Sequence, residues 1–374
     1  MTLISPLGYE QRKCDRLMEQ RSLSGLVVTS NENVFYTTGL PVTRGQVNPI
    51  LFGLSNQFPH YAVIRPGAKP ALVTWGGALP GHEFWVDDIR SAFVPGGTTE
   101  EAVGLLTESF KGPARLGIES SAPFGFVEKV KKALPQAELV VADEVFDDLR
   151  VVKSAAEIFM MKRSLDITER TVETVEQEMT STITTHQLIK RAEVLLHEFG
   201  AHGVDHATMA LGTANPEIPD DVPAKSGDLA VLDIGAILNG YVSDSRRLAI
   251  IGSLPADARE LNEKMASIVV QTGMAARKGM TFAGLCDVAD AKHAEQKLDP
   301  MFISVGHTIG IQTEEQWITR DSQRKFEERM VFNIEIYSRT ESNLFIGTED
   351  TFVVRAQGVE QLTRLPHEIF EVTK

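Results

Sequence analysis

Two aspartates, Asp233 and Asp244, lie eleven positions apart and could act together in chemistry. The first lies in an apolar run typical of a β-strand, and the second follows the dipeptide Asn239-Gly240. Asn-Gly between two apolar runs strongly predicts a β-hairpin, so we expect the two carboxylates on adjacent antiparallel strands. Half-buried acids in such a place lose hydration and repel each other, so a cation must meet them.

Two kinds of cation could neutralise this pair. Arg246 and Arg247 follow the second aspartate directly, and pairing with them would make the hairpin a purely structural feature. The alternative is a divalent metal ion, because carboxylate oxygens on rigid strands suit manganese, magnesium, iron or zinc. The hairpin alone leaves both alternatives open.

Three further residues of metal-binding type lie in the strand-rich C-terminal part, namely His307, Glu335 and Glu349. Each occurs in an apolar context and would, if taken singly, more often be a structural or solvated residue. Together with the two aspartates they form an oxygen-rich set with one nitrogen ligand. Two arginines cannot balance so many carboxylates, whereas two divalent ions that share bridging carboxylates can.

The first part of the chain predicts alternating helices and strands, which indicates an α/β domain with a mixed sheet. We expect a turn at residues 31–33, followed by a short apolar stretch at residues 34–36. The other expected elements are helices at residues 9–22 and 125–134 and strands at residues 25–29, 60–64, 71–75, 116–118 and 138–141.

The second part predicts helices packed on a largely antiparallel sheet, an α+β layout. Ser154, with Glu157 three residues later, forms a capping-box pattern that starts a long helix at residues 155–178. A change in composition near residues 143–153 separates the two parts, so we predict domains at residues 1–148 and 149–374. The remaining expected elements are helices at residues 186–200, 256–277 and 281–297 and strands at residues 302–305, 330–337 and 348–354.

Composition limits the class of protein. A chain of 374 residues is best divided into two domains, and its net charge of −14 argues against nucleic acid or an anionic membrane as a partner. Two distant cysteines give no disulfide framework, which suggests a reducing compartment. Neither a signal peptide nor a membrane-spanning run is recognisable, so we expect a cytoplasmic protein.

Several motifs carry a resemblance to a known family over nearly the full length. Asn33-Val-Phe-Tyr-Thr-Thr-Gly39 resembles the creatinase-type N-terminal domain, and residues 149–158 resemble the entry to its catalytic domain. Gly227-Asp228 followed by Val231-Leu-Asp-Ile-Gly-Ala236 resembles the motif of the first metal ligand. The family is that of the pita-bread metallopeptidases, which includes prolidase, aminopeptidase P, methionine aminopeptidase and the metal-free creatinase. The resemblance implies a curved, largely antiparallel sheet in the second domain.

The same resemblance implies the roles of the five candidate ligands. Two divalent ions are expected, manganese first, with iron, cobalt or zinc as alternatives, and a homodimer is expected as well. Asp244 and Glu349 would bridge the ions, Asp233 would complete one site, and His307 with Glu335 would complete the other. Glu335 would also carry the proton. The full predicted ligand set is Asp233, Asp244, His307, Glu335 and Glu349.

Peptidase members of the family carry two histidines near the metal ions, and this chain has neither of them at the equivalent position. The first should lie about 17 residues before Asp233, where this chain has Pro216, and His206 and His202 are the nearest candidates. The second should follow His307 by seven positions, where this chain has Glu314. A carboxylate at that place would repel a developing negative charge, which weakens the prediction of ordinary Xaa-Pro cleavage.

Other neighbours of the ligands differ too. A threonine is expected where Arg246 stands, an arginine where Gly347 stands, and Pro-Gly where Ile336-Tyr337 stands. A complete ligand set in changed surroundings predicts a changed substrate specificity, because such neighbours tune the metal and position the substrate.

Glu314, Glu315 and Trp317 form a cluster shortly after His307. An acid pair beside an aromatic ring could bind a cationic substrate through charge and cation–π contact. Alternatively, the acids form a solvated turn and the tryptophan packs against the fold. With His206 and Arg246, these three residues are our candidates for substrate binding.

The sequence thus predicts a dinuclear, metal-dependent hydrolase of an amide or peptide C–N bond that resembles an Xaa-Pro dipeptidase or aminopeptidase. Its substrate would be a dipeptide or another small molecule. One alternative is a hydrolase or lyase that acts on a small non-peptide amide, amidine or cationic substrate. The other is a catalytically idle scaffold that only binds a partner. No His-Glu-x-x-His, Gly-x-Ser-x-Gly or phosphate-binding glycine loop points to a different enzyme class.

Overall fold

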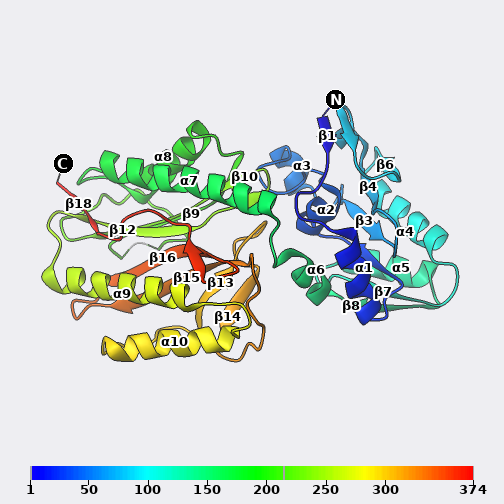
Figure 1. The fold of residues 1–374 in the computed structure, drawn as a ribbon. Coiled ribbons are helices and arrows are strands. Elements are labelled where there is room, and N and C mark those ends of the chain that lie inside the picture. Colours follow the sequence, from blue (N-terminus) through cyan, green and yellow to red (C-terminus); the bar gives the residue numbers. More distant parts are fainter. Residues whose placement is uncertain (1, 214, 374) are drawn as a thin grey trace. The chain divides into compact units, whose positions relative to one another are not determined.

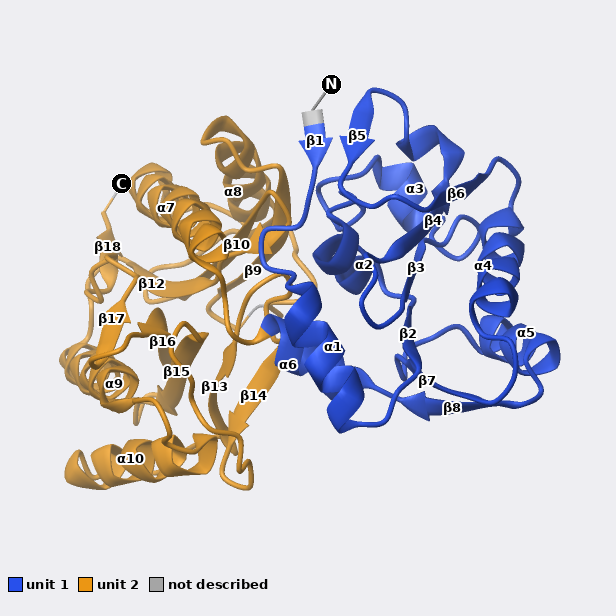
Figure 2. Cartoon of the chain, turned by 45° about the vertical axis from the view of Figure 1, so that its right-hand side comes forward, with its two compact units in different colours: residues 1–150 blue, residues 151–374 orange. Residues whose placement is uncertain are grey.

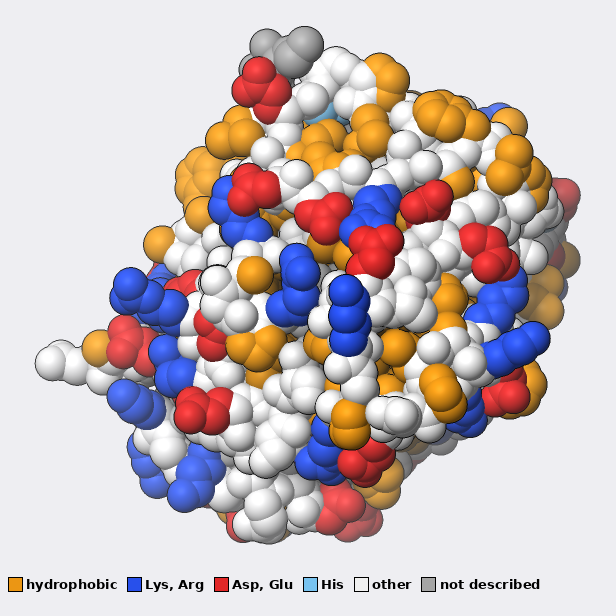
Figure 3. All heavy atoms as spheres, turned by 90° about the vertical axis from the view of Figure 1, so that its right-hand side faces the viewer, with side chains coloured by type: hydrophobic (Ala, Val, Ile, Leu, Met, Phe, Trp, Pro, Cys, Tyr) orange, Lys and Arg blue, Asp and Glu red, His pale blue; other side chains and the backbone are white. Residues whose placement is uncertain are grey.

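The structure, a computed structural model, describes residues 2–213 and 215–373. The chain forms two compact units, Met1–Arg150 and Val151–Lys374, which Figure 2 colours separately. Over the described residues, none of the helices combines the length and the apolar character that crossing a bilayer requires. On the face drawn in Figure 3, acidic and basic side chains are interspersed rather than gathered in one large basic patch.

The first unit is an α/β domain built on a six-stranded mixed sheet, which confirms the predicted class. Its strand order is β6-β4-β3-β2-β7-β8, with antiparallel pairs β2–β3 and β3–β4 and parallel pairs elsewhere. A separate parallel pair joins β1 and β5. The elements are β1 (Thr2–Ile4), α1 (Gln11–Gln20), β2 (Gly25–Val28), α2 (Asn31–Thr38), α3 (Pro49–Gly53), β3 (Tyr61–Ile64), β4 (Ala71–Trp75), a 3-10 turn (Gly76–Ala78), β5 (His82–Phe84), β6 (Ile89–Ala92), α4 (Gly97–Ser109), β7 (Ala114–Ile118), α5 (Phe124–Ala133), β8 (Ala137–Val141) and α6 (Asp143–Arg150).

The turn predicted at residues 31–33 is wrong, because these residues begin helix α2, which also contains the apolar stretch at residues 34–36. The Ser30 side chain accepts a hydrogen bond from the Asn33 amide and caps the helix start. Gly39, with φ of +80°, ends the helix in the left-handed conformation that glycine adopts without strain. Both ends are therefore capped, and this stabilises a helix of only eight residues.

The predicted boundary between residues 148 and 149 falls inside helix α6. The end of α6 is bound to the first unit, since the Leu149 carbonyl accepts hydrogen bonds from Tyr36 Oη at 2.7 Å and Lys13 Nζ at 3.0 Å. Arg150 Nη1 lies 3.0 Å from Asn33 Oδ1. These contacts hold the last residues of α6 in the first unit.

A buried histidine in the first unit leads to a prediction about acid stability. His60 hydrogen-bonds Thr74 at 2.7 Å, and burial lowers its pKa from the ordinary 6.5 to about 4. The unfolded chain therefore binds this proton more tightly, so stability is fully present above pH 6.5 and is lost as pH falls toward 4. The loss should reach about 2 kcal/mol at pH 5.

A His60→Gln variant should lack this part of the pH dependence. We expect its stability, relative to the unchanged chain, to improve by about 2 kcal/mol between pH 7 and pH 5. Urea unfolding followed by tryptophan fluorescence measures this, because Trp75 and Trp85 lie in the first unit. Equal pH dependence in the two proteins would contradict the prediction.

The second unit confirms the prediction of helices packed on largely antiparallel strands, and it divides the strands between two five-stranded sheets. One sheet runs β11-β10-β12-β18 with β9 also on β10, and the other runs β14-β13-β15-β16-β17. Only the β12–β18 pair is parallel within these described sheets. The elements are α7 (Ala155–Glu178), α8 (Thr185–Glu198), β9 (Gly203–Leu211), β10 (Leu229–Leu238), β11 (Tyr241–Val242), β12 (Ser245–Ile251), α9 (Ala256–Ala275), α10 (Phe282–Glu295), β13 (Ser304–Thr308), β14 (Gln316–Thr319), β15 (Val331–Arg339), β16 (Phe345–Val354), β17 (Val359–Gln361) and β18 (Phe370–Val372).

Helix pairs cover the two sheets of this unit, as Figure 1 shows. Helices α7 and α8 pack on the sheet of β9 to β12, while α9 and α10 pack on the sheet of β13 to β16. Helix α7 starts at the predicted capping box, in which Ser154 and Glu157 bind each other's backbone amides. The two sheets meet where β12 lies beside β16, which brings together the strands that carry the candidate ligands.

Candidate metal centre

The predicted hairpin is formed by β10, β11 and β12. Asn239 and Gly240 have φ of 50° and 80°, the two positive values that a type I′ turn requires. Asp233 lies on β10 directly opposite Arg246 on β12. Asp244 lies in the short gap between β11 and β12 and is 5% exposed. The chain therefore places both aspartates beside each other at the edge where the two sheets meet.

The other three candidate ligands lie on neighbouring strands of the second sheet. His307 lies on β13 opposite Asn333 of β15, and Glu335 of β15 lies opposite Glu349 of β16. The Asn333 amide donates to Glu349 Oε1 at 2.7 Å and fixes that carboxylate. His307 and Glu349 are 42 positions apart in the sequence (349 − 307 = 42). The antiparallel register of the strands nevertheless places their side chains close together.

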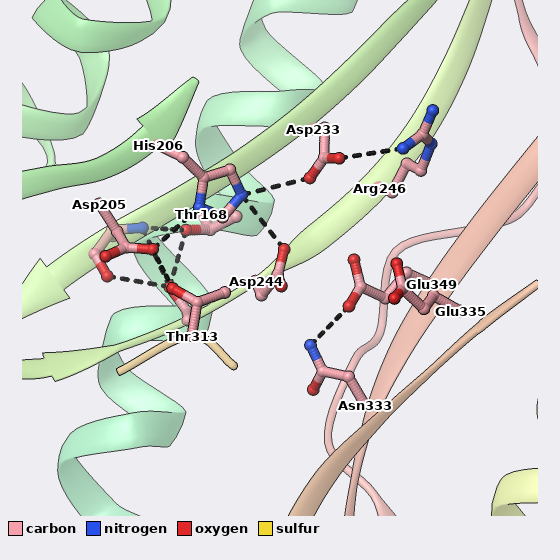
Figure 4. Close-up of polar contacts among 12 residues, drawn as sticks. Thr168, Asp205, His206, Asp233, Asp244, Arg246, Thr313, Asn333, Glu335 and Glu349 are labelled. Carbon is pink, nitrogen blue, oxygen red and sulfur yellow. Dashed lines mark hydrogen bonds and ion pairs between the residues drawn. The ribbon is translucent and has the colours of Figure 1, made fainter. Parts of the chain in front are cut away.

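The two groups of residues converge, as Figure 4 shows for most of them. His307 Nε2 lies 3.6 Å from Asp244 Oδ2 and 3.5 Å from Glu349 Oε1. The ligand-type atoms of Asp244, His307 and Glu349 lie within 4.8 Å of one another. Glu335 lies beside them, and its Oε2 accepts a hydrogen bond from the Tyr337 hydroxyl.

A further histidine enters this cluster, His206, which the sequence indicates as a candidate for substrate binding rather than as a metal ligand. It lies on strand β9, a strand that the sequence did not predict. His206 Nε2 lies 3.2 Å from Asp233 Oδ1 and 3.2 Å from Asp244 Oδ1. These three residues form a second group of ligand-type atoms within 4.8 Å. The ring lies over Gly235, where a Cβ would approach His206 Cε1 to 2.5 Å. A glycine on β10 therefore provides the room for this side chain.

The electrostatics of the cluster indicate unmet negative charge. Burial and then the neighbouring carboxylates raise the pKa of Glu335 and of Glu349 to about 7, and burial also raises the pKa of Asp244. Burial opposes a charged His307, but the carboxylate of Glu349 prevails and raises the pKa of His307 to about 10. Shifts of this kind arise where buried acids lack sufficient positive charge.

Asp233 differs from the other acids. Burial acts against its ionised form, yet the hydrogen bond from His206 and the nearby Arg246 hold the pKa of Asp233 below its usual value. Arg246 Nη1 lies 3.1 Å from Asp233 Oδ2. Arg247, by contrast, pairs with Asp350 at 2.7 Å and contacts neither aspartate of the hairpin. The sequence leaves open whether arginine or a metal ion neutralises the two aspartates. For Asp233, the partner is an arginine, Arg246.

The residues present fit a divalent ion at Asp244. Its buried Oδ1 atom has His206 Nε2 at 3.2 Å as an ion-pair contact but accepts no hydrogen bond from the described residues. A set of carboxylate oxygens with imidazole nitrogen is the kind of donor set that manganese, iron, cobalt and zinc accept. A dication would supply the positive charge that the pKa shifts of Glu335 and Glu349 indicate is missing.

The structure separates the three residues of the cluster after His307. Glu315 forms a buried ion pair with Lys153, with Oε2 and Nζ 2.7 Å apart. Trp317 is 42% exposed, and its ring meets the His307 ring edge-on at 5.4 Å between centroids. Glu314 is exposed. Because Lys153 neutralises Glu315, only Glu314 and Trp317 of this cluster remain available to contact a substrate.

Comparison with known proteins places this geometry in a family. Residues 160–356 match the model of metallopeptidase family M24, and residues 11–152 match that of the Creatinase/Prolidase N-terminal domain. The chain belongs to metallopeptidase family M24. This match confirms both the resemblance inferred from the motifs and the prediction of a metal-dependent hydrolase.

The relatives of this M24 member are distant in sequence, and most of those compared match over nearly the full length. An Xaa-Pro dipeptidase of Pyrococcus horikoshii is 25% identical over 373 residues, covering 97% of this chain and 99% of the relative. One of Pyrococcus furiosus is 29% identical over 273 residues, covering 71% and 78%. The solved prolidase of P. horikoshii OT3 superposes with a TM-score of 0.81 at 24% identity, covering 96% and 99% of the two chains. That of Thermococcus sibiricus superposes with a TM-score of 0.82 at 20% identity, covering 97% and 98%.

Proposed function

We propose that this chain hydrolyses the C–N bond of a dipeptide or a similarly small amide by means of a divalent metal ion. The observation that carries the proposal is the convergence of Asp244, His307 and Glu349 within 4.8 Å, with Glu335 beside them. Two Pyrococcus relatives named Xaa-Pro dipeptidase support a peptide substrate. Manganese is our first choice of metal, because the donor set is rich in carboxylate oxygen.

A bound ion would polarise the substrate carbonyl and lower the pKa of the attacking water. Glu335 is our candidate for the proton carrier between that water and the departing nitrogen. The Tyr337 hydroxyl donates to Glu335 Oε2 and so fixes the orientation of the carboxylate. Asn333 fixes Glu349 in the same manner, with its amide 2.7 Å from Oε1. Both contacts hold the ligand carboxylates in place before substrate binds.

A specific observation favours a second candidate, the hydrolysis of a small cationic or non-peptide amide. Exposed Glu314 and Trp317 lie shortly after His307, and the aromatic ring contacts that histidine directly. A carboxylate and a tryptophan together attract a cation. Under this proposal, Glu314 and Trp317 bind the charged end of the substrate.

We also propose that the protein is a cytoplasmic homodimer. The support for a reducing compartment is that Cys14 and Cys286 are both buried and unpaired. The dimer is an expectation from the family resemblance. Light scattering of the full-length chain tests it, and a mass of one chain would contradict it.

One substrate panel tests the activity. The chain, loaded with Mn²⁺, is incubated with Xaa-Pro dipeptides, other dipeptides, cationic amides and cyclic amidines, and products are followed by chromatography. We expect hydrolysis of at least one class and its loss when a chelator removes the ion. Cleavage of cationic amides alone would favour the second candidate. No turnover of any class, in a protein that binds Mn²⁺, would contradict a hydrolase and favour the idle scaffold.

A further inference from the structure

The positively charged side chain of Arg246 contacts Asp233, one of the candidate metal ligands. It lies on β12 directly opposite Asp233 on β10. Its Nη1 atom lies 3.1 Å from Asp233 Oδ2 and 3.3 Å from the Tyr337 hydroxyl oxygen. The side chain is only 12% exposed. Figure 4 shows the guanidinium directed at Asp233.

Aromatic side chains hold this guanidinium in place. Its central carbon lies 4.7 Å from the centroid of the Tyr337 ring and 5.8 Å from that of Phe345. The two rings stack on each other at 5.3 Å. Gly347, opposite Tyr337 on β16, makes room for the ring, because a Cβ there would lie 2.3 Å from Tyr337 Cδ1. The arginine is therefore held by contacts to several side chains rather than left free to swing into solvent.

The second oxygen of Asp233 also meets a nitrogen. His206 Nε2 lies 3.2 Å from Asp233 Oδ1, and the Nδ1 atom of the same ring lies 2.9 Å from Asp205 Oδ2. That oxygen of Asp205 also accepts a hydrogen bond from the Thr313 hydroxyl. The imidazole is thus fixed at both nitrogens, and both oxygens of Asp233 are engaged.

The total charge of the cluster determines how many divalent ions can bind beside Arg246. A guanidinium keeps its charge at every pH that a folded protein survives. Two divalent ions would by themselves match four ionised carboxylates, so a fixed arginine adds a surplus positive charge. A second ion at Asp233 would also have to compete with Arg246 for Oδ2, close to a like charge in a largely buried place.

We propose that Arg246 replaces one divalent cation at Asp233, so that the chain holds a single ion, bound by Asp244, His307 and Glu349 with Glu335. This inference rests on the proposed metal site but not on any particular substrate. It differs from the two ions that the sequence predicts. Asp233 then serves to hold Arg246 and His206 beside the ion rather than to bind a metal.

Metal stoichiometry, measured without reference to turnover, tests the proposal. The full chain is stripped with a chelator and titrated with Mn²⁺ by calorimetry, and elemental analysis after dialysis gives the bound content. Electron paramagnetic resonance separates an isolated Mn²⁺ ion from a magnetically coupled pair. We expect one ion per chain and an uncoupled spectrum.

The variant Arg246→Thr removes the cation. It should bind a second Mn²⁺ about 10- to 100-fold more tightly than the unchanged chain does and should give a coupled spectrum. Arg339→Thr is the matched control, since Arg339 is exposed and lies over the same Phe345 ring at 4.9 Å. The control should keep one ion and the uncoupled spectrum. Circular dichroism confirms that each variant is folded.

Three results would overturn the inference. The first is that the unchanged chain binds two ions with similar affinity and gives a coupled spectrum. This result does not depend on whether any variant folds. The second is a folded Arg246→Thr variant that still binds one ion. The third is a chain that binds no divalent ion, which overturns the proposed metal site as well. Failure to cleave peptides would contradict the proposed substrate and leave the measured stoichiometry to decide this inference.

Discussion

Substitution of Asp244 by Asn is expected to weaken Mn²⁺ binding more than about 100-fold and to remove hydrolysis of any substrate that the unchanged chain cleaves. Loss of residues that merely support a ligand already costs about 10- to 100-fold in metal affinity. Asp244 belongs to both groups of ligand-type atoms, one with His307 and Glu349 and one with His206 and Asp233. Its carboxylate is therefore the one whose loss should harm the cluster most.

Calorimetry with Mn²⁺ and turnover of the best substrate measure the effect of Asp244→Asn. The matched control is Asp257→Asn, because Asp257 is exposed in the first turn of α9. The control should keep both metal affinity and turnover. An Asp244→Asn variant that binds Mn²⁺ as tightly as the control would show that the ion lies elsewhere.

Removal of the Arg247 side chain is expected to cost about 3–5 kcal/mol in the free energy of unfolding of the second unit. Its guanidinium lies 2.7 Å from Asp350 Oδ1 and 2.7 Å from the Glu349 carbonyl, and it also donates to the carbonyls of Pro366 and Leu365. Asp350 is fully buried. The Arg247→Ala variant leaves that charge without its main partner, and this outweighs the cost of the deleted atoms alone.

Chemical unfolding measures the free energy of unfolding of the Arg247→Ala and Arg259→Ala variants. The comparison sets the loss of a buried ion pair against the loss of an exposed one. Arg259 pairs with Glu371 at 2.9 Å, and both side chains are more than a third exposed. Such surface pairs contribute about 0–1 kcal/mol. His367 Nε2 lies 2.8 Å from Asp350 and could take over part of its neutralisation. A loss no larger than that of the exposed control would contradict the prediction.

Features fixed by short stretches of sequence were predictable. The Asn239-Gly240 turn, the capping box at Ser154 and the long helix after it follow from neighbouring residues alone. The candidate ligands on β15 and β16 were found because their ionisable side chains interrupt otherwise apolar strands. The structure brings Glu349 together with His307 and Asp244, with their ligand-type atoms within 4.8 Å of one another.

Features that depend on contacts between distant segments were not predictable. Strand β9 was missed because Asp205 and His206 interrupt its apolar pattern, and such residues are poor indicators of a strand. His206 reaches the cluster only through the pairing of β9 with β10, opposite Gly235, just before a register shift. No spacing rule gives that register. Helices α2, α3, α4 and α6 of the first unit were likewise not predicted from periodicity.

The most direct test of the account is the turnover of the best dipeptide or amide substrate as Mn²⁺ is added back to chelator-treated protein. The account predicts no turnover without the ion and recovery in proportion to the metal that binds. Substitution of His307 by Ala should prevent that recovery, because its ring lies within 3.6 Å of both Asp244 and Glu349. Full turnover in protein that elemental analysis finds free of metal would contradict the central claim.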